Sequence, residues 1–356
     1  MRCKRNSNIE CLRIISMMMI VIGHYVGQNS VETWNVSLND VILFLLSSGS
    51  RIAVNVFLII GVYFMLDTKF KAERITSIYG QTIFYTYSLT IVSLFFNESQ
   101  ISVKAFLRGI IPFWGRALWF VSAYITLMFF APYLNQIIHS CNKKKLRILV
   151  ILCILFVSFV STLPNEQSGY LCDSIWFLIV YIIIGYLKKY KAFEKENKII
   201  LLLVGSGLYI CLVMLSYATA VCNSNKFITI FGMLSRQYLA DIRTIPNFAI
   251  ALCVFLFFIK CKEKHNDIII KLAKTAFPTY VFHQVPAFYP ILWKYVYCGE
   301  NWRGRHLFIW TIFVFITLFI IVSIIETFRE KCLESLWRNS KLVNKVNSKL
   351  NDLYEN

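Results

Sequence analysis

Long apolar runs recur along almost the whole of this chain, and most of them are long enough to cross a lipid bilayer as a helix. They lie at residues 9–27, 40–66, 78–96, 117–138, 147–163, 174–187, 199–221, 244–259, 275–297 and 306–326. A transmembrane helix needs about 20 mostly apolar residues, and lipid tolerates only helices and closed barrels as spanning structures. The sequence therefore predicts an all-α polytopic integral membrane protein, a bundle of about ten transmembrane helices.

The charge balance supports this reading and orients the bundle. Of the residues, 57% are hydrophobic and only 16% charged, against about 45–50% and about 25% in soluble domains. The formal net charge is +18, but 26 of the 37 Lys and Arg residues fall in alternate loops and only nine in the others. The positive-inside rule then places both termini in the cytoplasm. We expect the lipid bilayer, and no nucleic acid, as a partner.

The chain shows no linker, repeat or low-complexity tract that would divide it. We predict one transmembrane domain over residues 1–330, a cytoplasmic C-terminal tail over 331–356, and no appended extracytoplasmic domain. The 11 cysteines never form a C-x-x-C pair, so we expect no metal site. Glycine-rich phosphate loops are also absent from the sequence, which argues against a nucleotide-hydrolysing motor.

Five ionisable residues interrupt the apolar runs: Arg13, His24, Arg51, His283 and Glu326. A charge at the bilayer centre costs about 2.5–3.5 kcal/mol on insertion scales, so such residues usually face a cavity or a partner. On a helix, Arg13 and His24 would lie on the same face, within roughly 20° of each other around the axis and about 16 Å apart along it. A snorkelling Arg13 and a merely structural, hydrogen-bonded His24 are the alternatives, and spacing does not decide between them.

Two segments near the N-terminus resemble acyltransferase family 3 membrane proteins. The run N-I-E-C-L-R-I-I-S-M-M-M-I-V-I-G-H carries the family's pattern of Arg, ten residues and His at Arg13 and His24. The run R-I-A-V-N-V-F-L-I-I-G-V-Y-F is similar to the second-helix pattern, through Arg51 and Gly61, although Ile60 stands where Ser is usual. The resemblance implies a membrane-embedded acyltransferase fold.

Later segments extend the resemblance over most of the chain. Trp119 opens a run similar to the family's fourth helix, and Tyr280 with His283 resembles its late Tyr-x-x-His segment. Glu326 matches the Glu of the family's Glu-x-Pro ending, although Phe328 stands where the Pro is common. Lys71-Ala-Glu-Arg74 stands where the family carries Arg-x-x-Arg on the cytoplasmic side, and Lys binds phosphate as a point charge rather than through a planar fork.

The resemblance implies transfer of an acyl group, commonly acetyl, from cytoplasmic acyl-CoA to a hydroxyl on a cell-surface or envelope carbohydrate. Acetyl-CoA is thus the expected donor and a carbohydrate, such as a capsule or exopolysaccharide, the expected acceptor. We expect a multi-pass protein of the bacterial inner (cytoplasmic) membrane, and a homo-oligomer stays open. The rival hypotheses are a transporter or flippase that exports an acylated or small anionic substrate on the same scaffold, and a purely structural assembly factor.

Residue roles follow from the same resemblance. His24 is the candidate catalytic group, either as the base that deprotonates the acceptor or as a nucleophile that becomes acylated. Arg13 would orient the donor or stabilise charge on the thioester oxygen. Arg51, Lys71 and Arg74 are candidates for binding donor phosphates, with a pairing of Arg51 to Glu326 as the alternative for Arg51.

Four residues are expected to support the site or the substrate. Tyr280 belongs to the matched segment, and His283 would act as a second acid or base or as a hydrogen-bond partner. Glu326 is interpreted as an ion-pair partner of an intramembrane Arg. Trp119, together with Trp176 and Trp302, either stacks on sugar rings or belongs to an interfacial aromatic belt.

Overall fold

The computed structural model describes residues 5–28, 37–66, 68–96, 118–164, 172–221, 226–296 and 307–355, and within these ranges every regular element is helical. The first half comprises α1 (Ser7–Gln28), α2 (Leu38–Ser48), α3 (Ser50–Met65), α4 (Ala72–Ser93), η1 (Leu94–Phe96), α6 (Trp119–Ser140), α7 (Lys143–Cys153), η2 (Ile154–Phe159) and α8 (Val160–Thr162). The second half comprises α9 (Asp173–Lys189), α10 (Lys198–Val221), α11 (Lys226–Ala240), α12 (Ile245–Ile259), α13 (Asp267–Ala273), α14 (Ala276–Gln284), α15 (Tyr289–Tyr295), α16 (Leu307–Cys332), α17 (Glu334–Arg338) and α18 (Lys341–Glu355).

Six helical segments among the described residues are long and apolar enough to cross a membrane, or seven if a bent pair counts as one span. They are α1, α2 with α3, α6, α7 through α8, α10 and α16, and the bent pair is Thr229–Ala240 with Ile245–Ile259. The all-α membrane fold is confirmed, whereas the number of ten spans stays a prediction. Three expected spans are not among these membrane-length helices, each for a local reason. Helix α4 is rich in Thr, Ser and Tyr, α9 has only 17 residues, and the segment 275–297 is broken between α14 and α15.

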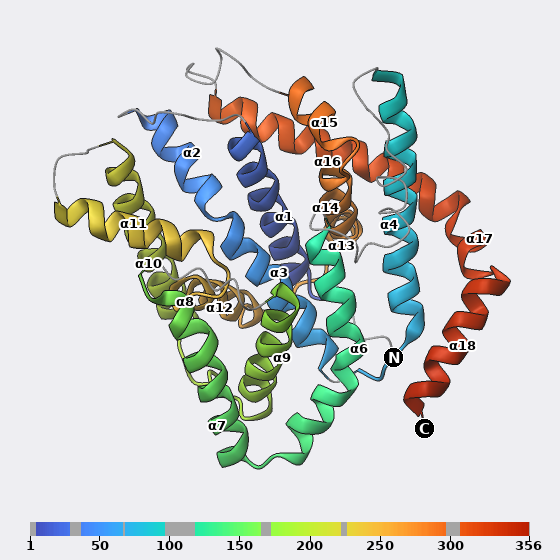
Figure 1. Ribbon diagram of the computed structural model, residues 1–356, viewed down its shortest axis with the longest axis horizontal. Coiled ribbons are helices and arrows are strands. Elements are labelled where there is room, and N and C mark those ends of the chain that lie inside the picture. The colour runs from blue at the N-terminus through green and yellow to red at the C-terminus, as the bar shows by residue number, and fades with distance from the viewer. Residues whose placement is uncertain are drawn as a thin grey trace.

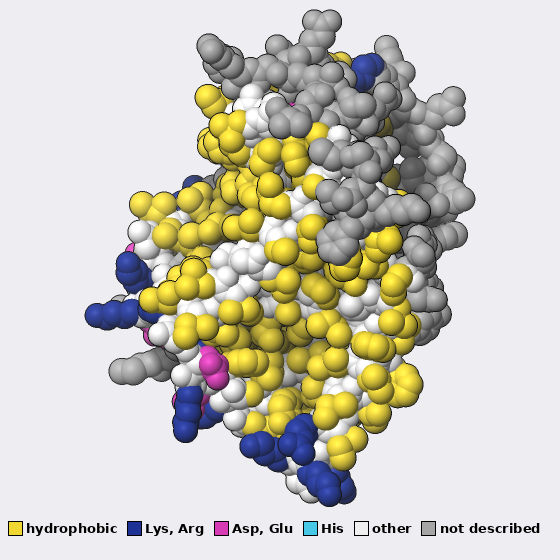
Figure 2. Space-filling view, turned by 90° about the vertical axis from the view of Figure 1, so that its left-hand side faces the viewer, with side chains coloured by type: hydrophobic (Ala, Val, Ile, Leu, Met, Phe, Trp, Pro, Cys, Tyr) yellow, Lys and Arg dark blue, Asp and Glu magenta, His cyan; other side chains and the backbone are white. Residues whose placement is uncertain are grey.

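A broad apolar surface covers the outside of the bundle. Figure 2 shows hydrophobic side chains over most of one face, with Lys and Arg gathered at its lower end and along one edge. Large apolar side chains on α10 are exposed, such as Leu203 at 64% and Val204 at 57%. A soluble protein rarely exposes so large an apolar area, so this surface fits contact with lipid.

The centre of the bundle is formed by α1, which packs against α3 and reaches α13, α14 and α16 (Figure 1). Close approach of α1 to α3 is possible because a Cβ on Gly23 would lie 2.3 Å from the Ser50 Cβ. The glycine next to His24 therefore allows α1 to lie directly against the start of α3.

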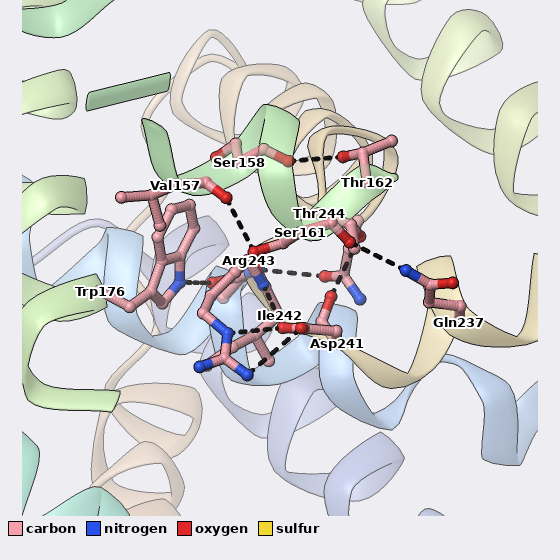
Figure 3. A network of polar contacts seen from close by, with 12 residues as sticks. Val157, Ser158, Ser161, Thr162, Trp176, Gln237, Asp241, Ile242, Arg243 and Thr244 are labelled. Carbon is pink, nitrogen blue, oxygen red and sulfur yellow. Dashed lines mark hydrogen bonds and ion pairs between the residues drawn. The ribbon is translucent and has the colours of Figure 1, made fainter. Parts of the chain in front are cut away.

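The break between α11 and α12 is held by a buried polar network. Asn55 on α3 donates to the carbonyl oxygen of Ile242 at 2.7 Å and to the Asn247 side chain at 3.0 Å, and it accepts the indole N–H of Trp176 at 3.0 Å. Gln237 donates to the carbonyl oxygens of Ser161 and Leu163 at the end of α8, and Figure 3 shows Gln237 and Ser161 beside the segment from Asp241 to Thr244. A helix break at membrane depth is tolerated where the protein itself satisfies the backbone.

The C-terminal residues fold back against α4 (Figure 1). The indole N–H of Trp337 donates to the Thr76 carbonyl oxygen at 3.0 Å, and the side chain of Asn351 accepts from the Ala72 amide at the start of α4 at 2.9 Å. Close packing requires Gly80, where a Cβ would lie 2.7 Å from the Trp337 ring. The segment predicted as a tail thus packs on the helical bundle, while its position in the cytoplasm stays a prediction.

Candidate functional site

The two histidines within the predicted spans lie together. The Nδ1 atom of His24 on α1 lies 2.9 Å from the Nε2 atom of His283 on α14, and their ring centroids are 5.1 Å apart. His283 is fully buried, and its Nδ1 lies 2.6 Å from the carbonyl oxygen of Thr279, one turn earlier. The Gln284 side chain also reaches His24 Nδ1, at 2.9 Å.

The Thr279 carbonyl group fixes the proton positions in this chain. A carbonyl oxygen only accepts, so His283 Nδ1 carries the proton and, in the neutral ring, His283 Nε2 accepts from His24 Nδ1. The opposite arrangement needs a doubly protonated His283, and an isolated buried cation is costly. In the structure the Gln284 Nε2 atom lies at this same Nδ1, and since a protonated Nδ1 cannot accept, the network requires the flipped amide, with the Gln284 carbonyl oxygen facing His24. The Nε2 atom of His24 is left with a free lone pair.

Such an arrangement is the geometry of an activated base or nucleophile. A reactive group oriented by a second group, which a third group orients in turn, is the general pattern of nucleophilic sites. Here Thr279 orients His283, and His283 orients His24. Tyr280 packs against His283 with ring centroids 5.9 Å apart, and Trp293 packs at 6.1 Å. These two buried rings limit the positions open to His283.

A large pocket of about 1250 Å³ opens on the side of the bundle that carries Arg13. Six basic and three acidic residues line it, together with an apolar part formed by residues such as Phe57, Met128 and Phe277. The basic residues are Arg5, Arg13, Arg74, Lys274, Arg329 and Arg338, and the acidic ones are Glu73, Glu330 and Glu334. The excess of positive charge beside an apolar surface suits an anionic ligand with a nonpolar arm.

Arg74 differs from the other basic residues of this pocket. Arg13 pairs with the buried Glu10 at 3.4 Å, Lys274 pairs with Glu330, and Arg329 and Arg338 pair with Glu334. The guanidinium of Arg74 instead donates to the Thr68 hydroxyl at 2.8 Å, and no carboxylate among the described residues forms an ion pair with it. Its charge is therefore the one most available to an incoming anion.

The pocket reaches toward the histidine pair without including it. Phe120, Tyr124 and Met128 line the pocket along about 12 Å of α6, at 1.5 Å per residue. Phe120 packs against Tyr280 with ring centroids 5.5 Å apart, and Tyr280 packs against His283. One aromatic side chain thus separates the inner end of the pocket from the histidines.

The structure divides the residues expected to bind the donor into two groups. Arg13 and Arg74 line the pocket, whereas Lys71 is an exposed residue at the start of α4 outside the pocket lining. Arg51 is exposed near the start of α3, within electrostatic range of His24. The donor-binding roles of all four stay predictions, but only two of these residues share the basic pocket.

Two contact predictions are corrected by the structure. Glu326 pairs with Arg329 at 2.7 Å and accepts from Tyr85 at 3.0 Å, so the alternative pairing of Arg51 with Glu326 is wrong. Arg329 lies one turn further along the same helix, and this local pairing fills the role expected of an Arg partner. Trp176 is fully buried and donates to Asn55, so it does not form an outer stacking surface.

The other tryptophans stay as sequence-based expectations. Trp119 is half-buried at the start of α6, where it packs edge-on against Phe120 and Phe177. Trp302 lies outside the described residues. Sugar stacking by Trp119 is therefore still a prediction, and so is any substrate role of Tyr280.

Sequence reasoning missed Gln284 and the C-terminal lining of the pocket. Gln284 follows His283 directly, which is a signal only once the His24 contact is known. The C-terminal signal is clearer, because Asn344, Asn347 and Asn351 recur at helical spacing on one face. All three line the pocket.

Membrane-length helices, a histidine pair that joins α1 to α14 and a basic pocket together define a membrane-embedded helical protein with polar groups inside its bundle. The sequence matches the acyltransferase domain of acyltransferase family 3 over residues 6–326, nearly the whole chain, and the chain belongs to that family. The family indicates a multi-pass membrane protein with acyltransferase activity. Neither a curated protein nor a solved structure matches the chain.

Proposed function

We propose that this protein is an O-acetyltransferase of the bacterial cytoplasmic membrane that moves an acetyl group from acetyl-CoA to a hydroxyl of a cell-surface carbohydrate. The observation that carries the proposal is the chain of contacts from Thr279 through His283 to His24, which leaves His24 Nε2 free to act. A histidine so oriented is suited to proton transfer at neutral pH.

The basic pocket is the proposed donor site. Its cations would hold the phosphates of acetyl-CoA, with Arg74 as the main anchor because no carboxylate of the described chain competes for it. The apolar residues on α3 and α6 would receive the pantetheine arm and direct the thioester toward Tyr280 and the histidines. Arg13 lies on the face of α1 that leads from the pocket to His24, about 16 Å further along the helix.

In the direct route, the chemistry requires one base that later acts as an acid. His24 Nε2 takes the proton of the acceptor hydroxyl, and the oxygen attacks the thioester carbonyl carbon. The C–S bond breaks, and the CoA sulfur takes the proton back from His24, so the products are an ester and free CoA. Throughout, His24 Nδ1–H donates to neutral His283, which stabilises the positive charge on His24.

A second route uses His24 as the nucleophile. His24 Nε2 attacks the thioester carbonyl carbon, the C–S bond breaks, and CoA leaves as a thiolate. The acceptor oxygen then takes the acetyl group from the acetyl-imidazole, which restores neutral His24; the hydroxyl proton is released to solvent, from which the thiolate is protonated. This route suits a site at which donor and acceptor arrive from different sides of a membrane. Both routes need the same orientation of His24 by His283.

The experiment that tests the function is mass spectrometry of the surface glycan from strains carrying the intact chain, the His24→Ala chain, or no chain. We expect an acetyl mass increment with the intact chain only, at equal amounts of membrane-inserted protein. An unmodified glycan in all three strains would contradict O-acetylation of the glycan. Export of an already acylated substrate, the rival hypothesis, predicts the same increment with the His24→Ala chain as with the intact chain.

A further inference from the structure

One face of α18 supplies a neutral polar wall to the basic pocket. Asn344, Asn347, Ser348 and Asn351 line the pocket and lie at i, i+3, i+4 and i+7, which places them on one side of the helix. Lys345 and Lys349, both exposed, lie more than 90° around the helix from the centre of this face. The helix therefore turns its uncharged amides, and not its cations, toward the pocket.

Two of the four residues hold the helix in place. The Asn347 side chain accepts from the Thr76 hydroxyl at 3.0 Å, and Asn351 accepts from the Ala72 amide and donates to Glu73 at 3.0 Å. These contacts join α18 to the first turns of α4, the helix that carries Arg74. They fix the distance between the polar wall and the available guanidinium.

The other two residues are free to bind a ligand. Asn344 and Ser348 are exposed, and neither side chain makes a hydrogen bond to any residue in the described part of the chain. An asparagine amide offers a donor and an acceptor side by side, the arrangement that pairs with the N6 and N7 edge of adenine. A serine hydroxyl both donates and accepts, and so suits a ribose hydroxyl or a base edge.

We propose that α18 is the adenosine-binding wall of the donor site, with Asn344 and Ser348 as the contacting residues; this inference rests on the proposed function. The phosphates lie near Arg74, and the nucleoside extends from them along the amide face of α18. Residues 327–356 lie outside the region matched by the family. Recognition of the nucleoside is thus a property of this chain's own C-terminal segment.

The test compares two donors that differ only in the nucleotide. Binding of acetyl-CoA and of S-acetyl-4′-phosphopantetheine, which lacks the adenosine and its two phosphates, is measured on the purified full chain in lipid nanodiscs. The variants are Asn344→Ala combined with Ser348→Ala, and Lys345→Ala as the control on the opposite face of α18. We expect the double variant to bind acetyl-CoA about tenfold more weakly, as the loss of two modest hydrogen bonds implies, with S-acetyl-4′-phosphopantetheine binding unchanged.

The outcomes separate this inference from the proposed function. Unchanged acetyl-CoA binding by the double variant, or an equal loss for both donors, would overturn the adenosine-binding role and leave acyl transfer intact. A wild-type protein that binds neither donor would overturn the donor site, and the adenosine-binding wall with it. Correct insertion of each variant is checked by its elution as a single species of the wild-type size.

Discussion

His24 Nδ1 and His283 Nε2 lie 2.9 Å apart although 259 residues separate them along the chain. The contact joins the central helix α1 to the short helix α14, and it gives His24 a defined proton on Nδ1 and a free lone pair on Nε2. The activity of this family member should therefore depend on both histidines, but in different ways.

Removal of His283 should lower turnover without weakening donor binding. We expect His283→Phe to reduce kcat by about 100-fold, the typical effect of a small misplacement of a reacting group, with the KM for acetyl-CoA unchanged. His283→Gln should retain more activity, because its amide oxygen can still accept from His24. Equal loss in both variants, or a raised KM in either, would contradict a positioning role.

Arg74 should bind the donor phosphates more than any other residue of the pocket. We expect Arg74→Ala to raise the Kd for acetyl-CoA by about 10- to 100-fold, because hydrogen bonds to charged groups contribute about 1.5–3 kcal/mol. Lys71→Ala serves as the matched control, since Lys71 lies nearby but outside the pocket lining. Isothermal titration in nanodiscs measures both, and a larger effect at Lys71 would reverse the assignment.

Gly61 should keep the pocket open by leaving room for Tyr124. A Cβ on Gly61 would lie 2.6 Å from the Tyr124 hydroxyl oxygen, so Gly61→Ala must displace the phenol. We expect weaker acetyl-CoA binding by Gly61→Ala and partial recovery when Tyr124→Phe is added, because the closest atom is then removed. Binding of each variant to acetyl-CoA tests this, and no recovery in the double variant would point to a different clash.

Glu334, at the junction of α16 and α17, should make the stability of the protein depend on pH. Partial burial on its own raises the pKa of Glu334, but hydrogen bonds from Arg329 and Arg338 outweigh it and hold that pKa below its usual value. A lowered folded-state pKa stabilises the protein above the unfolded-state pKa, and the stabilisation is lost as pH falls through the folded-state pKa. The difference in Tm between the wild-type protein and Glu334→Gln should be largest at neutral pH and shrink on acidification. A difference independent of pH would exclude this linkage.

The Asn55 network should matter for stability and not for chemistry. Asn55→Leu would leave the indole N–H of Trp176, the Ile242 carbonyl group and the Asn247 side chain without this partner. Each unsatisfied buried group costs about 1–3 kcal/mol, so Tm should fall by several degrees. The exposed Gln136→Leu is the control, and thermal unfolding in detergent is the measurement. A Tm equal to that of the wild-type protein would show that the network is dispensable.

The fold class and the candidate histidines could be predicted from the sequence because they rest on composition and local spacing. Apolar runs predicted the helices, and the Arg13 and His24 spacing predicted one face of α1. Contacts between residues distant in the sequence could not be predicted. The contact of His24 with His283 depends on how α14 packs, and the sequence left the pairing of Arg51 with Glu326 open as an alternative although Arg329 stands three residues from Glu326 on the same helix.

The role of the C-terminal segment was hidden for a related reason. Its Lys and Asn content is typical of a solvated tail, whereas the packing of Trp337 against Gly80 and the contacts of Asn347 and Asn351 with α4 bring the amide face of α18 to the pocket. Helix breaks were equally hard to predict. The apolar run 275–297 gives no sign of the break between α14 and α15, and the sequence does not reveal that Asn55 and Gln237 satisfy the break between α11 and α12.

The most direct test of the central claim follows acetyl transfer by the purified protein in proteoliposomes. Labelled acetyl-CoA is supplied with the glycan acceptor, and free CoA and acetylated glycan are measured over time for the wild-type and His24→Ala proteins. We predict equal amounts of CoA and ester from the wild-type protein, and neither above background from His24→Ala, although that variant still binds acetyl-CoA. Acetylated glycan formed by His24→Ala at the wild-type rate would contradict the account.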